Sequence, residues 1–417
     1  MRILQVCKKF PYPVRDGEGV AVRALALGLR EAGCEVDLLS FNTSKHRVKN
    51  PQEADLPHYE RIASCDLDND VNWWAAAWSV FQRGSYHVNR FDCDEFRIQL
   101  RTLLQMERYD AVILETSILA LYIPVIRQHS DAVIALRAHN LEHEIWARIG
   151  RRGSPWLRPA YRMFARRLER FERHWVNRAD QLLPITARDG EQFVSDLGYE
   201  GPLHVVPVGY DMSAARVAAT EPPSDLPFAI SFIGSLDWAP NLEGLEWFLR
   251  DVWPLLHAHF PELQFHIAGR KTPGHIEGLR LPGVYVHGEV DDADAFLRRF
   301  PMTVAPILSG SGTRVKILDA MSAGRVVLTT QMGLEGIDAA DRGEVLLCRS
   351  PTAFIDQVRY VREQPDRLAR IGAAAEDFIR RHFDFARIGF GVASQLRDRR
   401  AERRAAGVSA RGRHRPR

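Results

Sequence analysis

The chain lacks both an apolar run long enough to cross a bilayer and a targeting segment at its start. Its 417 residues hold no stretch of about 18 consecutive apolar residues, the length that a transmembrane helix requires. The N-terminus, MRILQVCKKF, lacks the long apolar core of a signal peptide and is typical of a first β-strand. These two absences predict a cytoplasmic protein.

Cysteine is scarce, and its pattern argues against two kinds of site. The five cysteines are odd in number and without CxxC spacing, which disfavours a disulfide framework and a zinc site. An Asp-x-Asp metal motif is also missing from any convincing place, because DLDND (66–70) falls in an irregular segment and predicts a solvated loop. We therefore expect neither a metal ion nor another cofactor. The cysteines are Cys7, Cys34, Cys65, Cys93 and Cys348.

The length and the charge distribution indicate two soluble domains followed by a basic tail. A chain of 417 residues exceeds the size of one hydrophobic core, so two domains of about 200 residues are expected. The net charge of +3 is concentrated in residues 397–417, which hold nine Arg against two acidic residues. This tail has no aromatic residue for base stacking, so we expect a disordered extension and no nucleic-acid partner.

Strand and helix patterns alternate twice along the chain, which is typical of parallel sheets covered on both faces. Residues 207–227 are rich in Pro, Ala and Ser and show no strand period, so they predict a boundary. The expected fold class is α/β, with two doubly wound Rossmann-like domains facing across a cleft. We place the N-terminal domain at 1–210 with an irregular aromatic insertion at 45–95, the C-terminal domain at 211–385, and a terminal helix with a basic disordered tail at 386–417.

A glycine-rich loop and a basic helix follow one strand of the second alternation. In SGSGTRVKILDAMSAG (309–324), the glycines let the backbone approach a ligand, and the N-terminus of the helix attracts anions. Arg314 and Lys316 suit phosphate oxygens, and Asp319 can accept hydrogen bonds from sugar hydroxyls. This combination indicates a nucleotide-binding site. An ordinary turn and a solvated helix remain the alternative, because neither GxxxxGK[ST] nor GxGxxG occurs here.

Several segments of the chain, in the right order over roughly residues 1–385, resemble the GT-B glycosyltransferases, specifically the retaining family called group 1 or family 4. In the second half these segments are FIGSLDWAPNLEGLEWFL (232–249), HIAGR (266–270), VHGEVDD (286–292), APILSGSGTRVKILDAMSAGRVVLTT (305–330) and GLEGI (333–337). In the first half they are the strand, glycine loop and helix of residues 7–41, together with HNLEHE (139–144), ADQLLPIT (179–186) and VVPVGYD (205–211).

The resemblance implies metal-independent transfer of a hexose-type sugar from a nucleotide-sugar donor, with retention at the anomeric carbon. It implies a donor site in the C-terminal domain and an acceptor site in the N-terminal domain. The family pattern of Glu, seven residues, Glu falls on Ser311 and Asp319, so the first acid is absent and the second is one methylene shorter. Arg314 and Lys316 match the diphosphate clamp of the G-x-R-x-K variant and are expected to be catalytic, together with His139.

The resemblance also selects the remaining site residues, and for each of them a purely structural role is the alternative. On the acceptor side these are Asp16, Asn140 and Glu142. Backbone amides near Asp237 and Asn241 are expected to line the diphosphate site. The expected donor-binding residues are Gly17, Gly19, Gly234, Ser235, Arg270, Gly310, Ser311, Gly312, Thr313, Asp319 and Glu335.

The expected partners are a nucleotide sugar and a carbohydrate or lipid-linked acceptor, in the synthesis of a surface polysaccharide or glycolipid. Residues 158–180 predict a basic amphipathic helix, which is compatible with contact at the inner face of a membrane, although packing on its own domain is favoured. Two other functions stay open. They are a sugar-nucleotide-binding protein without transferase activity and a GT-B-type nucleotide-sugar epimerase.

Overall fold

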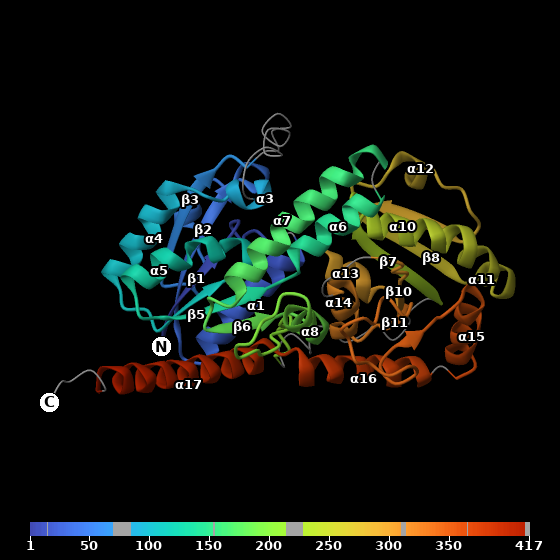
Figure 1. Cartoon of the computed structure of the whole chain (residues 1–417). Coiled ribbons are helices and arrows are strands. Elements are labelled where there is room, and N and C mark those ends of the chain that lie inside the picture. Colours follow the sequence, from blue (N-terminus) through green and yellow to red (C-terminus); the bar gives the residue numbers. More distant parts are fainter. Residues whose placement is uncertain are drawn as a thin grey trace. The chain divides into compact units, whose positions relative to one another are not determined.

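The chain forms two compact units, each built around a six-stranded parallel sheet (Figure 1). Unit 1 comprises Met1–Gly209 and Phe385–Arg417, and unit 2 comprises Tyr210–Asp384. The computed structural model describes residues 1–14, 16–69, 85–152, 155–213, 228–309, 314–364 and 366–412. Within these ranges, no helix combines the length and the apolar character needed to cross a membrane.

The sheet of unit 1 has the strand order β3-β2-β1-β4-β5-β6. Its strands are apolar because helices cover both faces, with α1 and α17 on one side and α4, α5, α7 and α8 on the other. The strands are β1 (Arg2–Cys7), β2 (Glu35–Thr43), β3 (Arg61–Leu67), β4 (Ala111–Leu114), β5 (Val133–Ala138) and β6 (Gln181–Pro184). The helices are α1 (Gly17–Glu31), α3 (Tyr86–Asn89), α4 (Asp94–Met106), α5 (Ile123–His129), α6 (Glu142–Arg152), α7 (Arg158–Val176), α8 (Ala187–Ser195) and α17 (Phe385–Gly412).

Helix α17 corrects the prediction of a disordered basic tail. Residues 397–412 continue this helix, which docks on unit 1. The Nε of Arg399 donates to the carbonyl oxygen of Asp180 at 3.0 Å, and Arg403 Nη1 donates to that of Ala132 at 2.9 Å. The helix also crosses α1 at very short range, since a Cβ on Gly389 would lie 2.0 Å from the backbone of α1. Tertiary contacts thus order a segment whose composition favours disorder.

Part of the expected irregular insertion at 45–95 is an edge strand. Residues 61–67 form β3, so the predicted solvated loop at 66–70 is wrong for its first two residues. Asp66 at the end of β3 accepts a hydrogen bond from Asn42 Nδ2 at 2.8 Å. Phe91 packs on Phe41 in the core. Trp73, Trp74 and Trp78, which make this segment aromatic, lie outside the described residues.

The sheet of unit 2 has the strand order β12-β11-β10-β7-β8-β9. Phe248, Phe265 and Phe354 form the centre of the core on one face, and Phe296 and Phe300 cover part of the other. The strands are β7 (Ala229–Ser235), β8 (Gln264–Arg270), β9 (Val284–Gly288), β10 (Met302–Ala305), β11 (Val326–Thr329) and β12 (Leu346–Leu347). The helices are α10 (Ala239–Trp247), α11 (Trp253–His259), α12 (Gly274–Glu277), α13 (Ala293–Arg298), α14 (Val315–Ser322), α15 (Pro351–Arg362) and α16 (Asp366–His382).

Both sheets share one topology. The first three strands of each sheet are added outward in one direction, and the next three are added in the other direction from the first strand. The reversal falls between β1 and β4 in unit 1 and between β7 and β10 in unit 2. This confirms the predicted α/β class with two doubly wound, Rossmann-like domains. In such sheets ligands bind beyond the carboxyl ends of the strands at the reversal point, so these two edges are where a site is expected.

Candidate functional site

Unit 2 carries a connected polar network at the carboxyl ends of β7 and β8. Lys316, in the first turn of α14, donates from Nζ to Asn241 Oδ1 at 2.6 Å. Asn241 Nδ2 donates to the backbone carbonyl of Ser235 at 2.9 Å, and Arg270 Nη2 donates to the hydroxyl of Ser235 at 3.3 Å. The last residue of β7 thereby links two cations. The network lies at the reversal point of the sheet.

Lys316 is half-buried, and its surroundings weaken its positive charge. Its Nζ lies 4.9 Å from the centre of the Phe232 ring, and it donates a hydrogen bond to the neutral amide of Asn241. Burial, and then the charge of Arg314, lower the pKa of Lys316 to about 7. The backbone at Gly234 passes so close that a Cβ there would lie 3.4 Å from Lys316 Nζ. A negative charge bound next to this amine would therefore raise its pKa.

Arg314 is held from the loop that follows β11. Its side chain is 7% exposed, and Nη2 lies 3.3 Å from Glu335 Oε2. The Nε of Arg314 donates to the carbonyl oxygen of Met332 at 3.4 Å. The structure therefore places the predicted residues Arg314 and Glu335 together, as an ion pair that fixes the guanidinium beside the network.

Asp319 lies one turn further along α14 and has a partner within unit 2. The hydroxyl of Tyr210 donates to Asp319 Oδ1 at 2.9 Å. Its expected role toward ribose stays a prediction. The predicted loop residues Gly310, Ser311, Gly312 and Thr313 lie outside the described part of the chain.

In unit 1, a buried charge network surrounds the predicted histidine at the end of β5. His139 Nε2 lies 2.8 Å from Glu115 Oε2, and Arg137 Nη1 lies 3.3 Å from the same oxygen. Gln5 Nε2 donates to the other carboxylate oxygen. Burial alone would raise the pKa of Glu115, but Arg137, His139 and Gln5 hold it below its usual value. His139 is therefore fixed in orientation by a carboxylate.

Glu142, the first residue of α6, is also buried and paired. Its carboxylate lies 3.4 Å from Lys8 Nζ, and Thr116 Oγ1 donates to it at 3.3 Å. Lys8 Nζ lies equally close to Glu18 on α1. Although burial opposes its charge, Glu142 and Glu18 raise the pKa of Lys8 above its usual value. Asn140 lies half-buried in the turn before α6.

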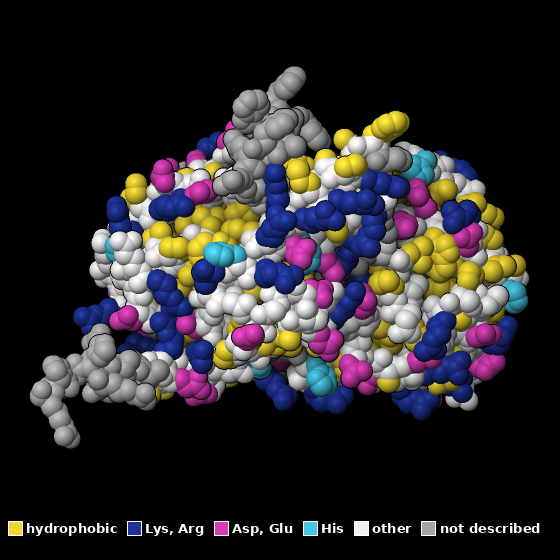
Figure 2. Space-filling model, viewed as in Figure 1, with side chains coloured by type: hydrophobic (Ala, Val, Ile, Leu, Met, Phe, Trp, Pro, Cys, Tyr) yellow, Lys and Arg dark blue, Asp and Glu magenta, His cyan; other side chains and the backbone are white. Residues whose placement is uncertain are grey.

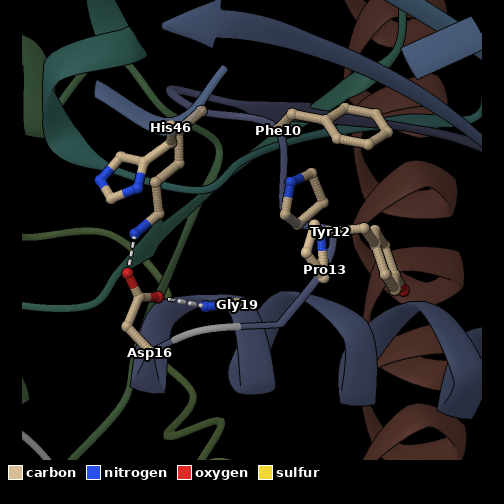
Figure 3. A pocket seen from close by; sticks show the side chains of 8 residues that line it. Phe10, Tyr12, Pro13, Asp16, Gly19 and His46 are labelled. Carbon is tan, nitrogen blue, oxygen red and sulfur yellow. Dashed lines mark hydrogen bonds and ion pairs between the residues drawn. The ribbon is translucent and has the colours of Figure 1, made fainter. Parts of the chain in front are cut away.

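Two of the predicted residues at the start of α1, Asp16 and Gly19, border a pocket (Figure 3). Asp16 is the N-cap of this helix, and one of its carboxylate oxygens accepts from the Gly19 backbone N–H at 3.0 Å while the other lies 2.5 Å from Lys9 Nζ. Gly17 is the first residue of α1. Asp16 therefore has a structural role, and its expected acceptor role stays a prediction. The pocket is lined by Lys9, Phe10, Pro11, Tyr12, Pro13, Asp16, Gly19 and His46.

The sequence reasoning missed several side chains that complete these clusters, among them Glu115, Lys8 and Phe232. Glu115 and Lys8 each follow a buried strand directly, and a charged residue at that position is a signal that identifies them. Phe232 has no such signal, because an aromatic residue inside a strand is typical of a core. Among the described residues, no three His, Cys, Asp or Glu side chains are grouped so as to hold a metal ion.

Comparisons with known proteins give a consistent result for both halves. A model described as "Glycosyl transferase 4-like domain" matches residues 16–209, and one described as "Glycosyl transferases group 1" matches residues 227–364. An uncharacterized 44.6 kDa protein in the cps region of Klebsiella pneumoniae is 22% identical over 410 residues, covering 93% of this chain and 97% of its own.

Solved structures with the same fold cover nearly the whole chain. Sucrose-phosphate synthase from Thermosynechococcus elongatus matches with a TM-score of 0.66 and 16% identity, over 95% of this chain and 99% of its own. HepE of Anabaena in complex with UDP matches with a TM-score of 0.63 and 13% identity, over 95% of this chain and 100% of its own. HepE is also similar in its complex with UDP-glucose, with a TM-score of 0.58 and 13% identity over the same shares of the two chains.

Proposed function

Because this chain belongs to the group 1 glycosyl transferases and has a GT-B fold, we propose that it moves a hexose from a nucleotide sugar to an acceptor with retention and without a metal ion. Membership in this family makes the protein a glycosyltransferase. The donor, the acceptor and the stereochemistry belong to the proposal.

One observation carries the proposed donor site. Arg270 and Lys316 lie at the end of β7, at the reversal point of the unit 2 sheet, and Arg314 is close enough to Lys316 for its charge to lower the pKa of that amine. Three cations at such an edge complement a diphosphate, which carries at least two negative charges. Gly234, near the end of β7, has no side chain, so a diphosphate can approach the backbone closely there.

The proposed chemistry uses these cations on the leaving group. As the bond between the anomeric carbon and the phosphate oxygen breaks, negative charge builds on the diphosphate and positive charge on the sugar ring. Arg314 is already fixed by Glu335, so it stabilises this charge with little reorganisation. Lys316 adds a full charge once it is protonated. The oxygen of the acceptor hydroxyl then bonds to the anomeric carbon on the face that the diphosphate leaves, which gives retention, and the hydroxyl proton passes to the leaving diphosphate.

Two relatives suggest what to test first. HepE has been solved with UDP and with UDP-glucose, so uridine nucleotides are the first donors to assay. The relative from Klebsiella pneumoniae belongs to a cps region, which supports a polysaccharide or its lipid-linked precursor as the acceptor.

Calorimetry with UDP, GDP and ADP in EDTA tests the donor site. We expect one nucleoside diphosphate to bind without added metal, and Arg314→Ala or Lys316→Ala to weaken binding by about 1.5 to 3 kcal/mol each. Arg349→Ala, an exposed position elsewhere in unit 2, serves as the control. Unchanged affinity in both site variants, or binding that requires magnesium, would overturn the proposal.

A turnover assay then separates the proposed transfer from the two alternatives. Incubation with the sugar nucleotide and an acceptor should release free nucleoside diphosphate and form a glycoside. An epimerase would return an isomeric sugar nucleotide, and a binding protein would return the donor unchanged.

A further inference from the structure

Helices α6 and α7 of unit 1 form a hairpin whose inner sides are used in packing. A Cβ on Gly150 would lie 2.6 Å from the Cβ of Tyr161, so the two helices are in direct contact. The Trp146 ring lies 5.9 Å from that of Phe164, and Leu168 on α7 is buried. The apolar face of α7 therefore packs within its own unit, as the sequence favoured.

The outer face of α7 carries a stripe of arginines. Arg158, Arg162, Arg166 and Arg170 are spaced four residues apart, which places them on one side of the helix, and all four are exposed. In the described part of the chain, no carboxylate lies within 4.0 Å of any of these four guanidinium groups, whereas the next residue of the stripe, Arg173, pairs with Glu169. Figure 2 shows Lys and Arg side chains gathered over α6 and α7.

The end of this hairpin exposes large apolar side chains. Trp156 is 91% exposed, the highest value among the large hydrophobic residues that the structure describes, and Leu157 is 50% exposed. Ile149, in the last turns of α6, is 44% exposed. Hydrophobic side chains at the end of the hairpin are visible in Figure 2. A partner that covers both features must offer an apolar region to the exposed side chains and negative charge to the arginines.

We propose that the end of the α6–α7 hairpin docks on an anionic lipid bilayer, with Trp156 and Leu157 in the headgroup region and the arginine stripe on lipid phosphates. An aromatic indole is favoured at the boundary between headgroups and acyl chains, and each basic side chain near an anionic surface adds attraction. A nucleic acid would satisfy the stripe but would leave the apolar end in water. The inference goes beyond sugar transfer, because the donor cluster lies in the other unit, so either proposal can fail alone.

Sedimentation of the full chain with vesicles tests the docking surface. We expect binding to vesicles that contain phosphatidylglycerol, little binding to phosphatidylcholine alone, and loss of binding at high salt. The triple variant Arg162→Gln, Arg166→Gln and Arg170→Gln should bind roughly 100-fold more weakly, since each cation contributes about a fivefold factor. Trp156→Ser should weaken binding about tenfold.

Two matched controls separate the effect of this hairpin surface from the effect of losing positive charge, or an exposed aromatic side chain, anywhere on the chain. Arg280→Gln, Arg349→Gln and Arg370→Gln remove the same charge from exposed positions of unit 2, and Phe390→Ser removes an exposed aromatic side chain that is not on the hairpin. Both controls should bind vesicles like the unaltered chain, and all variants should keep nucleotide affinity.

Three outcomes would overturn the inference. They are equal binding to both kinds of vesicle, equal effects of the hairpin variants and their controls, and binding to polyuridylate in place of phosphatidylglycerol vesicles.

Discussion

Nucleotide binding should consume a proton at Lys316, so affinity should fall as the pH rises above neutral. In the free protein the pKa of this amine is about 7, because burial and Arg314 oppose its charge. A bound diphosphate supplies negative charge and returns the pKa toward its ordinary value of 10.5. Above neutral pH the bound form keeps the proton that the free form has lost, so binding becomes weaker there.

The size of the effect follows from that difference in pKa. Linkage between the two states predicts that the dissociation constant rises roughly 50-fold between about pH 7 and pH 9, close to one decade for each unit. Proton uptake on binding should increase from about half a proton at pH 7 to about 0.9 at pH 8. Phosphate groups have largely completed their own titration in this range, since their second pKa lies near 6.

Calorimetry in buffers of different ionisation enthalpy measures both quantities. Lys316→Arg is the matched control, because a guanidinium stays charged over the whole range and should abolish the dependence. A dissociation constant that is flat from neutral pH upward, or an equal slope in the arginine variant, would refute this reasoning.

Three further substitutions test other contacts. Gly234→Ala places a Cβ 3.1 Å from Asn241 Nδ2 and should weaken nucleotide binding about tenfold while thermal unfolding stays nearly unchanged; unchanged affinity would count against the site. Gly389→Ala places a methyl group 2.0 Å from the backbone of α1 and should lower the free energy of unfolding by about 3 kcal/mol in urea titrations, whereas a loosely docked helix would tolerate it. Glu115→Gln leaves Arg137 buried without its counter-charge, so it should lower the free energy of unfolding by about 3 kcal/mol in the same urea titrations. An unchanged free energy of unfolding would mean that the pair does not contribute to stability.

The same linkage acts on stability with the opposite sign. Because the pKa of Lys316 is lower in the folded protein than its ordinary 10.5, the unfolded chain binds more protons between about pH 7 and pH 10. The contribution of this residue to the free energy of unfolding therefore rises with pH across that window. Urea titrations without nucleotide, compared with Lys316→Met, measure it, and a contribution that falls with pH would contradict the assignment.

Local patterns in the sequence determined the α/β class and the cationic segment of the site. The alternation of apolar strands with amphipathic helices predicts two doubly wound sheets, because each period reports which faces are buried. The spacing in SGSGTRVKILDAMSAG places Arg314 and Lys316 at the start of a helix after a buried strand, and the structure has them there. Short-range pattern is sufficient for these features because both depend on neighbouring residues only.

Tertiary structure decided the partners of those groups and the state of the tail. Lys316 bonds to Asn241, 75 residues earlier, and the depressed pKa follows from burial that no local pattern encodes. The basic tail has the composition of a disordered segment, yet residues 397–412 continue α17. The backbone carbonyl oxygens of Asp180 and Ala132, both distant in sequence, accept hydrogen bonds from Arg399 and Arg403. Free energies of burial and pairing depend on which residues the fold brings together, so only the folded chain determines them.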